Sequence, residues 1–506
     1  MGRHRVALTV VLAFLCAVAC APAAVAGRSA PATPGAAGIG DPLFPRLGNG
    51  GYDVLHYDLR LRYETSAPSQ ALDGTVRIVA RATQALSRFD LDFAGSALGD
   101  VYVNGRPAAW TRDGEELVVT PPRPLRRGQV FATRVRHFTA TPTAVRPGQA
   151  SVAFFSSPDG SATAPQPDLA HQLFPSNDHP RDKARFTFTL DVPQGTTAVA
   201  NGVYAGRDAR AGRWVWHYRQ RRPMATELTQ IAVGRFTITQ RTGPEGVAVR
   251  DVTPTRLTAG LLPKLAVVTE QLAWLRERVG DYPFDVYGTL VVDAPLGFAL
   301  ETQTLSIFDT SWFTDRRGVW EGGMTHELTH QWFGDSVSPY SWSDVWLNEG
   351  HATWYEGLYT EEKGLLADVT ASFTPGGFAT VDAVMRWAYG LGDAFRSLWG
   401  PVARPTGPAV EDLFSPQVYY GGALVLYALR QEIGAEAFAA LERRWVQRFR
   451  GRSVSTLDFI ALASEVAGRD LAPFLRAWLY GTKTPPMPGH PDWTVTPAAA
   501  AAGAAA

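Results

Sequence analysis

The chain has 506 residues, of which 45% are hydrophobic and 19% are charged, and its 48 basic residues balance 48 acidic ones. This length exceeds what one hydrophobic core supports, so we expect two or more domains. A net charge of zero argues against nucleic acid or an anionic membrane surface as a partner, because both attract basic proteins.

The first residues are typical of a secretion signal. Residues 3–5 are Arg-His-Arg, residues 6–18 form an apolar run too short for a convincing membrane span, and residues 24–26 form an Ala-Val-Ala cleavage site. We therefore predict a signal peptide over 1–26 and a secreted mature protein without a transmembrane span.

Two alternatives to simple secretion stay open at this terminus. Residues 17–20 (Ala-Val-Ala-Cys) are similar to a lipoprotein box, which would anchor the mature protein at the cell surface through Cys20; an uncleaved anchor is the second alternative. Cys16 and Cys20 are the two cysteines of the chain, so the mature protein is predicted to have no disulfide framework and no cysteine metal ligand.

The next segments predict a linker and then a β-rich domain. Residues 27–50 are rich in Ala, Gly, Pro and Ser without periodicity, which indicates a flexible linker. After it, polar and apolar residues alternate in short runs, and Asn104-Gly105 is a hairpin turn signal. The segment 51–240 is therefore predicted to be an all-β sandwich or saddle. Its strands are expected at 56–63, 75–80, 88–93, 116–120, 130–138, 152–155, 185–192 and 198–203.

After residue 240 the pattern favours helices. Apolar residues recur at helical spacing over 256–279, an apolar strand is expected at 287–292, and Ser341 is a candidate N-cap. We assign 241–485 to a mostly helical domain and 486–506 to an irregular, low-complexity tail, so the fold class is multidomain α+β. Further helices are predicted at 319–333, 417–433, 435–449, 455–467 and 470–480.

One stretch indicates a metal site. His326 and His330 are the two histidines of an H-E-x-x-H motif. Glu349 follows nineteen positions after His330, within Trp-Leu-Asn-Glu-Gly. Two imidazoles four residues apart share one helix face, and a carboxylate from the next helix completes a three-ligand zinc site with an open fourth position. We predict one Zn²⁺ per chain.

Glu327 lies between the two histidines in the motif. Zinc lowers the pKa of a bound water from about 15.7 toward about 7, so Glu327 can accept that proton as general base and later deliver it to the leaving amine. Asp335 and Asn348 are candidates for hydrogen bonds to the ligating imidazoles, and both equally fit capping or loop roles.

The zinc motif resembles that of the gluzincin aminopeptidases, which include aminopeptidase N and leukotriene A4 hydrolase. Residues 296–304 (Leu-Gly-Phe-Ala-Leu-Glu-Thr-Gln-Thr) are similar to the family's exopeptidase strand, and residues 174–184 to its β-domain signature. Residues 282–284 and 418–423 also match family positions, so the likeness covers 52–486. The resemblance implies a thermolysin-like catalytic domain after the β domain, in the short two-domain form of secreted bacterial members, with an open cleft; we expect a monomer.

The resemblance also implies roles for single residues. Glu301 corresponds to the glutamate that binds the free α-amine of the substrate. Tyr419 corresponds to the tyrosine that hydrogen-bonds the developing oxyanion, with Tyr420 as its rival. Phe298 and Thr302 replace the usual glycine and asparagine, which leaves the shape of the first subsite open. The remaining expected substrate contacts are Gly297, Ala299 and Gln166.

These observations together predict a zinc aminopeptidase that hydrolyses the N-terminal peptide bond of peptides with a free N-terminus. A zinc endopeptidase is the alternative enzyme, and Glu301 argues against it. A catalytically inactive family member that acts as a binding module is the alternative from another class, and the intact zinc motif argues against that.

Overall fold

The computed structural model describes residue 2 and residues 31–95, 98–149 and 151–496. Apart from Gly2, the predicted signal peptide with Cys16 and Cys20 lies outside the described residues, as does the Ala-rich end of the predicted tail. Ala32–Ala506 forms one unit. Among the helices that the structure describes, none has the length and apolarity needed to cross a membrane.

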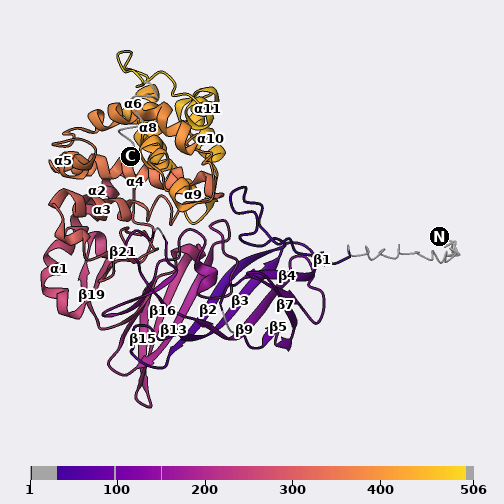
Figure 1. Ribbon diagram of the computed structural model, residues 1–506. Coiled ribbons are helices and arrows are strands. Elements are labelled where there is room, and N and C mark those ends of the chain that lie inside the picture. The colour runs from indigo at the N-terminus through magenta and orange to yellow at the C-terminus, as the bar shows by residue number, and fades with distance from the viewer. Residues whose placement is uncertain (1, 3–30, 96–97, 150, 497–506) are drawn as a thin grey trace. The chain divides into compact units, whose positions relative to one another are not determined.

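The first half of the described chain folds into strands, and each strand predicted there overlaps an observed one (Figure 1). Asn104 and Gly105 have φ values of +51° and +77°, the left-handed pair of a type I′ hairpin. The strands are β1 (Thr33–Pro34), β2 (Tyr52–Tyr63), β3 (Leu72–Ala82), β4 (Leu86–Asp92), β5 (Val101–Val103), β6 (Arg106–Pro107), β7 (Ala109–Asp113), β8 (Glu116–Thr120), β9 (Val130–Ala140), β10 (Thr143–Ala144), β11 (Phe154–Ser157), β12 (Gly160–Thr163), β13 (Ala184–Pro193), β14 (Thr197–Ala200), β15 (Val203–Arg210), β16 (Arg213–Met224) and β17 (Ile231–Gly234).

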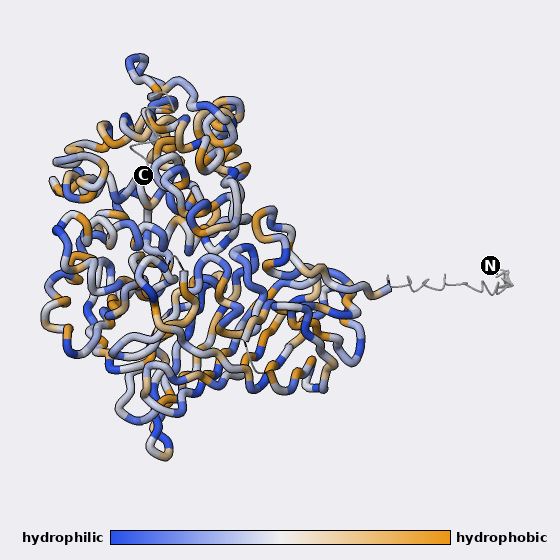
Figure 2. Tube along the Cα trace, in the orientation of Figure 1, coloured by the Kyte–Doolittle hydropathy of each residue, from blue (hydrophilic) through white to orange (hydrophobic). Residues whose placement is uncertain are grey.

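These strands form three sheets around one β-rich core. The largest has the order β15-β16-β13-β2-β3-β9-β5-β6, and the others have the orders β1-β4-β8-β7 and β10-β11-β12-β17-β14. Tyr57, Leu59 and Leu61 alternate with more exposed residues along β2 and belong to the buried core. Figure 2 shows this interleaving of hydrophobic and hydrophilic residues along the chain. The predicted all-β domain is therefore present.

The second half combines a four-stranded sheet of order β18-β19-β20-β21 with α-helices. This confirms the expected order of a β-rich domain followed by a mostly helical one. The strands are β18 (Phe236–Thr242), β19 (Ala248–Pro254), β20 (Val286–Val292), β21 (Ser306–Asp309), β22 (Ser338–Pro339) and β23 (Ser453–Val454). The helices are α1 (Thr258–Leu265), α2 (Val268–Val279), α3 (Arg317–Thr329), α4 (Trp346–Glu362), α5 (Leu366–Val369), α6 (Val381–Trp399), α7 (Val410–Leu413), α8 (Pro416–Ile433), α9 (Ala435–Phe449), α10 (Thr456–Ala467) and α11 (Ala472–Tyr480).

Several helices differ from the predicted pattern, and the short helices α5 and α7 were also not predicted. The helix expected over 256–279 is broken between α1 and α2, shortly after Pro263, whose missing amide and bulky ring weaken the helix. Helix α6 was not predicted, although its buried residues recur at helical spacing; Gly390 and Gly392 within it have low helix propensity. Helix α3 ends at Thr329 rather than at 333, because the amides of Gln331 and Trp332 bond to carbonyls three residues back, which ends the regular α-helical pattern.

Residues 32–50 are packed, although a flexible linker was expected there. Strand β1 pairs with β4, and Asp41 is only 1% exposed. The Asp41 carboxylate accepts hydrogen bonds from His179 Nε2 (3.0 Å), Ser341 Oγ (3.0 Å) and Trp342 N (2.8 Å). A single buried carboxylate therefore fastens this segment to the β-rich half and to the turn that precedes α4.

We expect Asp41→Ala to lower the free energy of unfolding by about 3–5 kcal/mol, because it removes the shared acceptor of several buried donors. Thermal unfolding followed by calorimetry or circular dichroism measures the effect. Asp100→Ala, at an exposed position, is the control and should leave the Tm almost unchanged. Equal Tm values for the two variants would contradict the role assigned to Asp41.

Candidate zinc centre and substrate cleft

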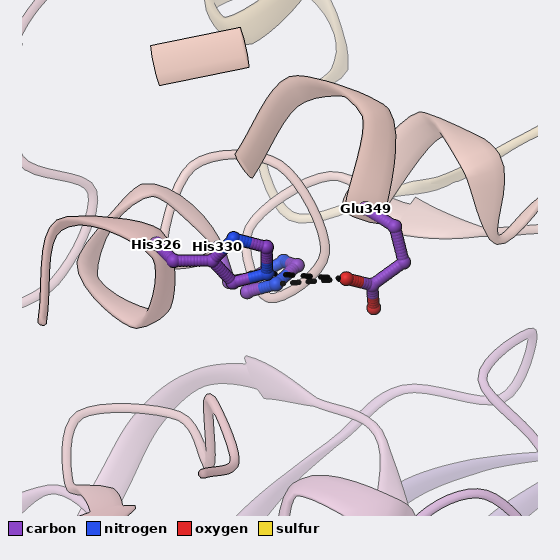
Figure 3. Close-up of side chains that lie close together, drawn as sticks. All are labelled: His326, His330 and Glu349. Carbon is purple, nitrogen blue, oxygen red and sulfur yellow. Dashed lines mark hydrogen bonds and ion pairs between the residues drawn. The ribbon is translucent and has the colours of Figure 1, made fainter. Parts of the chain in front are cut away.

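Helices α3 and α4 bring the three predicted metal ligands together (Figure 3). His326 lies on α3, His330 caps its C-terminus, and Glu349 lies in the first turn of α4. The Nε2 atoms of His326 and His330 are 3.3 Å and 3.4 Å from Glu349 Oε2. All three side chains are buried.

This arrangement fits a tetrahedral zinc ion. Ligand bonds of about 2.0–2.1 Å at tetrahedral angles place neighbouring ligand atoms about 3.3–3.4 Å apart, which agrees with the observed separations. Two imidazoles and one carboxylate are also the ligand set of open catalytic zinc sites. Burial by itself raises the pKa of Glu349, but His330 and His326 outweigh burial and lower it to about 2, so the carboxylate is charged and able to bind a metal.

The second nitrogen of each imidazole is also bonded. His326 Nδ1 lies 3.0 Å from Glu356 Oε2, and His330 Nδ1 lies 3.1 Å from the carbonyl oxygen of Phe333. These acceptors favour the tautomer that leaves each Nε2 free for the metal. Glu356 is seven residues after Glu349 on α4, so both point from one helix face.

The prediction that Asp335 and Asn348 bond the imidazoles is therefore wrong. The chain turns back directly after His330, which brings the Phe333 carbonyl to its Nδ1 instead. Asp335 contributes its backbone carbonyl, which accepts a hydrogen bond from Lys183 Nζ at 2.7 Å. Glu356 and the Phe333 carbonyl were not predicted; a carbonyl has no sequence signature, whereas the seven-residue spacing of Glu356 was a usable signal.

We expect Glu356→Ala to weaken zinc affinity about 10–100-fold, because His326 loses the acceptor that orients its imidazole. Competition with a chromogenic chelator measures the affinity. Glu361→Ala, on the same helix, is the control and should bind zinc like the parent. Unchanged affinity in Glu356→Ala would show that the Glu356 contact does not hold the ligand.

Two further carboxylates lie beside the ligands. One ligand atom each of Glu301, Glu327 and His330 lie within 4.8 Å of one another. Glu301 Oε1 accepts a hydrogen bond of 2.7 Å from Gln166 Nε2, so Gln166, which was expected to contact the substrate, reaches the site. Glu327 Oε2 makes no hydrogen bond within the described part of the chain. Burial, opposed by the two imidazoles, raises the pKa of Glu327 to about 8.

Gln331, which the sequence analysis did not single out, fixes Glu301 against the zinc helix. Its Nε2 donates to the Glu301 carbonyl (2.9 Å), and its Oε1 accepts from Thr304 N (2.8 Å). Thr304 has a φ of +67°, which is unfavourable for a β-branched residue. The two hydrogen bonds of the Gln331 side chain hold this strained loop in place.

The predicted backbone-contact residues precede Glu301 on the same loop. Leu300 and Ile307 exchange backbone hydrogen bonds of 3.0 Å and 2.8 Å, which attaches the loop to β21. Gly297 is exposed with a φ of +74°, and Ala299 is half-buried. Thr302 is fully buried and donates to Gln230 Oε1 (3.0 Å), so this departure from the family pattern points into the protein.

The two adjacent tyrosines of α8 have different surroundings. The Tyr419 ring stacks on the His326 ring at 5.7 Å with an interplanar angle of 17°. The Tyr420 ring lies edge-on to Phe373 (5.1 Å) and Trp387 (5.5 Å), which stack on each other at 4.6 Å. Burial and the nearby carboxylates raise the pKa of Tyr419 well above its ordinary value, so its hydroxyl remains a donor. Tyr419 is therefore the tyrosine that faces the zinc ligands.

Comparison with known proteins connects both halves to one family. Residues 54–228 match the Peptidase M1 N-terminal domain, and residues 280–478 match the Peptidase family M1 domain. The crystal structure of the M1 zinc metallopeptidase from Deinococcus radiodurans is 31% identical, with a TM-score of 0.75 over 89% of this chain and 99% of that one. A mutant of that protein bound to a Tyr-Ser-Ala substrate matches equally well, over 90% of this chain and all of that one.

Named relatives include longer proteins. Aminopeptidase N from Streptomyces lividans is 28% identical over 331 residues, which are 61% of this chain and 36% of that protein. Leucyl aminopeptidase from Saccharolobus solfataricus is 24% identical over 346 residues, which are 66% of this chain and 42% of that protein. The matched regions thus span well under half the length of these two relatives.

Proposed function

The chain belongs to the M1 family of zinc metallopeptidases, and on that premise we propose that it is an aminopeptidase that releases N-terminal residues from peptides. The observation that supports this activity is the buried Glu301 carboxylate beside Glu327 and the zinc ligand His330. An α-amine has a pKa of about 7.7–8.0 and is largely cationic at neutral pH. A substrate whose amine lies at Glu301 presents its first peptide bond to the zinc ligands.

The residues of the site divide the hydrolytic work. Zinc, when bound by His326, His330 and Glu349, polarises the scissile carbonyl and lowers the pKa of a bound water. Glu327, whose carboxylate lies beside the zinc ligand His330, takes a proton from the attacking water as the carbon–oxygen bond forms. Glu327 then gives that proton to the leaving amine as the carbon–nitrogen bond breaks. The Tyr419 hydroxyl donates to the carbonyl oxygen as negative charge develops on it.

The alternatives fit the site less well. In an endopeptidase complex a neutral internal segment would cover Glu301 and leave a buried carboxylate without a cation, which is costly. A binding module without activity needs neither Glu327 nor Tyr419, and both are present and face the site. The substrate class proposed for this chain is therefore peptides with a free N-terminus.

Glu327→Gln should keep one zinc per chain and lose about 10²–10⁴-fold in kcat, because the general base is removed while the ligands stay. Metal analysis and steady-state assays with an aminoacyl fluorogenic substrate measure both quantities. In the parent, a chelator should abolish activity and added zinc should restore it. Retained turnover in the variant would show that another group is the base.

Glu301→Gln should lower kcat/KM for a free dipeptide about 30-fold or more, because the substrate's ammonium loses its buried counter-charge. The N-acetylated form of the same peptide is the control substrate. The parent should cleave only the free form, and the variant should discriminate less. If the variant keeps the parental ratio of the two rates, Glu301 does not bind the amine.

Tyr419→Phe should reduce kcat about 10²–10³-fold with a smaller change in KM, because the lost donor acts mainly on the charge of the transition state. Tyr420→Phe is the matched control one residue away and should keep kcat within a few-fold of the parent. Steady-state kinetics on one substrate compare the variants. Equal losses in both would assign the effect to helix packing.

A further inference from the structure

A second cleft lies away from the zinc ligands. Its volume is about 730 Å³, and residues of β15, β16, β18, β19 and β20 line it; Figure 1 labels β15, β16 and β19. Neither the zinc ligands nor Glu301, Glu327 and Tyr419 are among the lining residues. One wall is aromatic, with Tyr204 5.9 Å from Trp216 and 5.6 Å from Tyr218 between ring centroids. Tyr204 is 48% exposed, so the wall is open to solvent.

Arg250 lines the same cleft and is 4% exposed. Its Nη2 donates to the Ala200 carbonyl at 2.7 Å, and its Nε has no hydrogen-bond partner within the described residues. Its guanidinium lies 5.4 Å from the Tyr218 ring centroid. Among the residues that the structure describes, no carboxylate forms an ion pair with Arg250.

The neighbouring arginines differ from Arg250 in the partners of their guanidinium groups. Arg241 also lines the cleft, but its guanidinium pairs with Asp251 and donates to the Leu265 carbonyl. Arg207, at the rim, stacks on Trp214 at 3.9 Å and on Trp216 at 4.9 Å. No residue that lines the cleft is acidic. The cleft therefore holds an excess of positive charge, and part of that charge is buried.

A buried guanidinium without an anion is costly, because one carbonyl and one tyrosine ring compensate its desolvation only in part. A planar carboxylate matches the donor fork of arginine, and flat apolar groups pack well against tyrosine and tryptophan rings. The cleft thus combines a cationic floor with an aromatic wall. A ligand that satisfies both carries a carboxylate next to an apolar or aromatic group.

We propose that this cleft is a second binding site for a carboxylate attached to an aromatic or apolar side chain. A peptide C-terminus and a free N-acylated amino acid share this chemistry. The site is independent of the zinc reaction, because its lining and its proposed ligand group differ from those of the zinc centre.

Calorimetric titration of the zinc-loaded protein tests the proposal. The ligands are N-acetyl-L-tryptophan and its uncharged amide, with the zinc centre blocked by a saturating amino-acid hydroxamate so that carboxylates do not bind there. The acid should bind at least about tenfold more tightly than the amide. Arg250→Met should remove this preference, and Arg210→Met, an exposed arginine of β15 outside the cleft lining, should keep it.

An N-acetylated tripeptide that ends in tryptophan, as acid and as amide, distinguishes the two sources. A preference for the peptide acid over N-acetyl-L-tryptophan supports a peptide C-terminus, and the opposite order supports a free acylated amino acid. Equal affinity for acid and amide in both pairs overturns the proposal, as does a preference that survives in a folded Arg250→Met variant.

A second variant keeps the test decisive if Arg250→Met does not fold. Tyr204→Ala alters an exposed side chain of the aromatic wall. It should weaken the binding of the acid and of the amide, in each pair of ligands, about fivefold or more. If Tyr204→Ala binds the ligands like the parent, the ligand lies elsewhere and the proposal fails.

Discussion

The side-chain amide of Gln331 connects the zinc helix to the loop that carries Glu301, the residue proposed to bind the substrate's amine. It follows His330 directly in the chain, and its two ends bond to the Glu301 carbonyl and the Thr304 amide. A planar amide of fixed length allows little sliding, because a shift of the loop against the zinc helix lengthens both bonds. If Glu301 binds the substrate's amine as proposed, the preference for the end of a peptide depends on this rigid connection.

The β-rich half contributes directly to the site. Gln166, in the loop after β12, donates to Glu301, and Lys183, just before β13, donates to the carbonyls of Asp335 and Ser336 after the zinc helix. Burial lowers the pKa of Lys183 to about 8, although the nearby Asp335 and Glu227 favour its charged form. The site therefore lies where the two halves meet, and the β-rich half supplies hydrogen-bond donors to it.

The zinc triad could be predicted from sequence because its geometry is almost local. Two histidines four residues apart must share a helix face, and Glu349 needs only the next helix to pack against it. Tyr419 followed from its register in a short motif. Asp41 could not be predicted, because a segment rich in small residues gives no sign that one carboxylate meets donors more than a hundred residues away.

Other features that the sequence did not predict have a different physical origin. The partner of His330 is a backbone carbonyl, and every residue carries one, so no sequence pattern points to Phe333. The Asp335 side chain was a reasonable candidate by proximity, but neither of its carboxylate oxygens has a hydrogen-bond partner within the described residues. Helix α6 was missed because its two glycines resemble a loop signal, whereas tertiary packing keeps Val384, Met385 and Tyr389 buried.

The contrast between Tyr419 and Tyr420 has a consequence for how α8 moves. Consecutive residues on a helix project about 100° apart, so the ring that faces the metal ligands and the ring held by Phe373 and Trp387 are rigidly coupled. A rotation of α8 that moved the Tyr420 ring toward the stacked Phe373 and Trp387 rings would be opposed by both of them. Tyr420 therefore limits the rotation of α8 in that direction, and the same packing helps to keep the Tyr419 ring against His326.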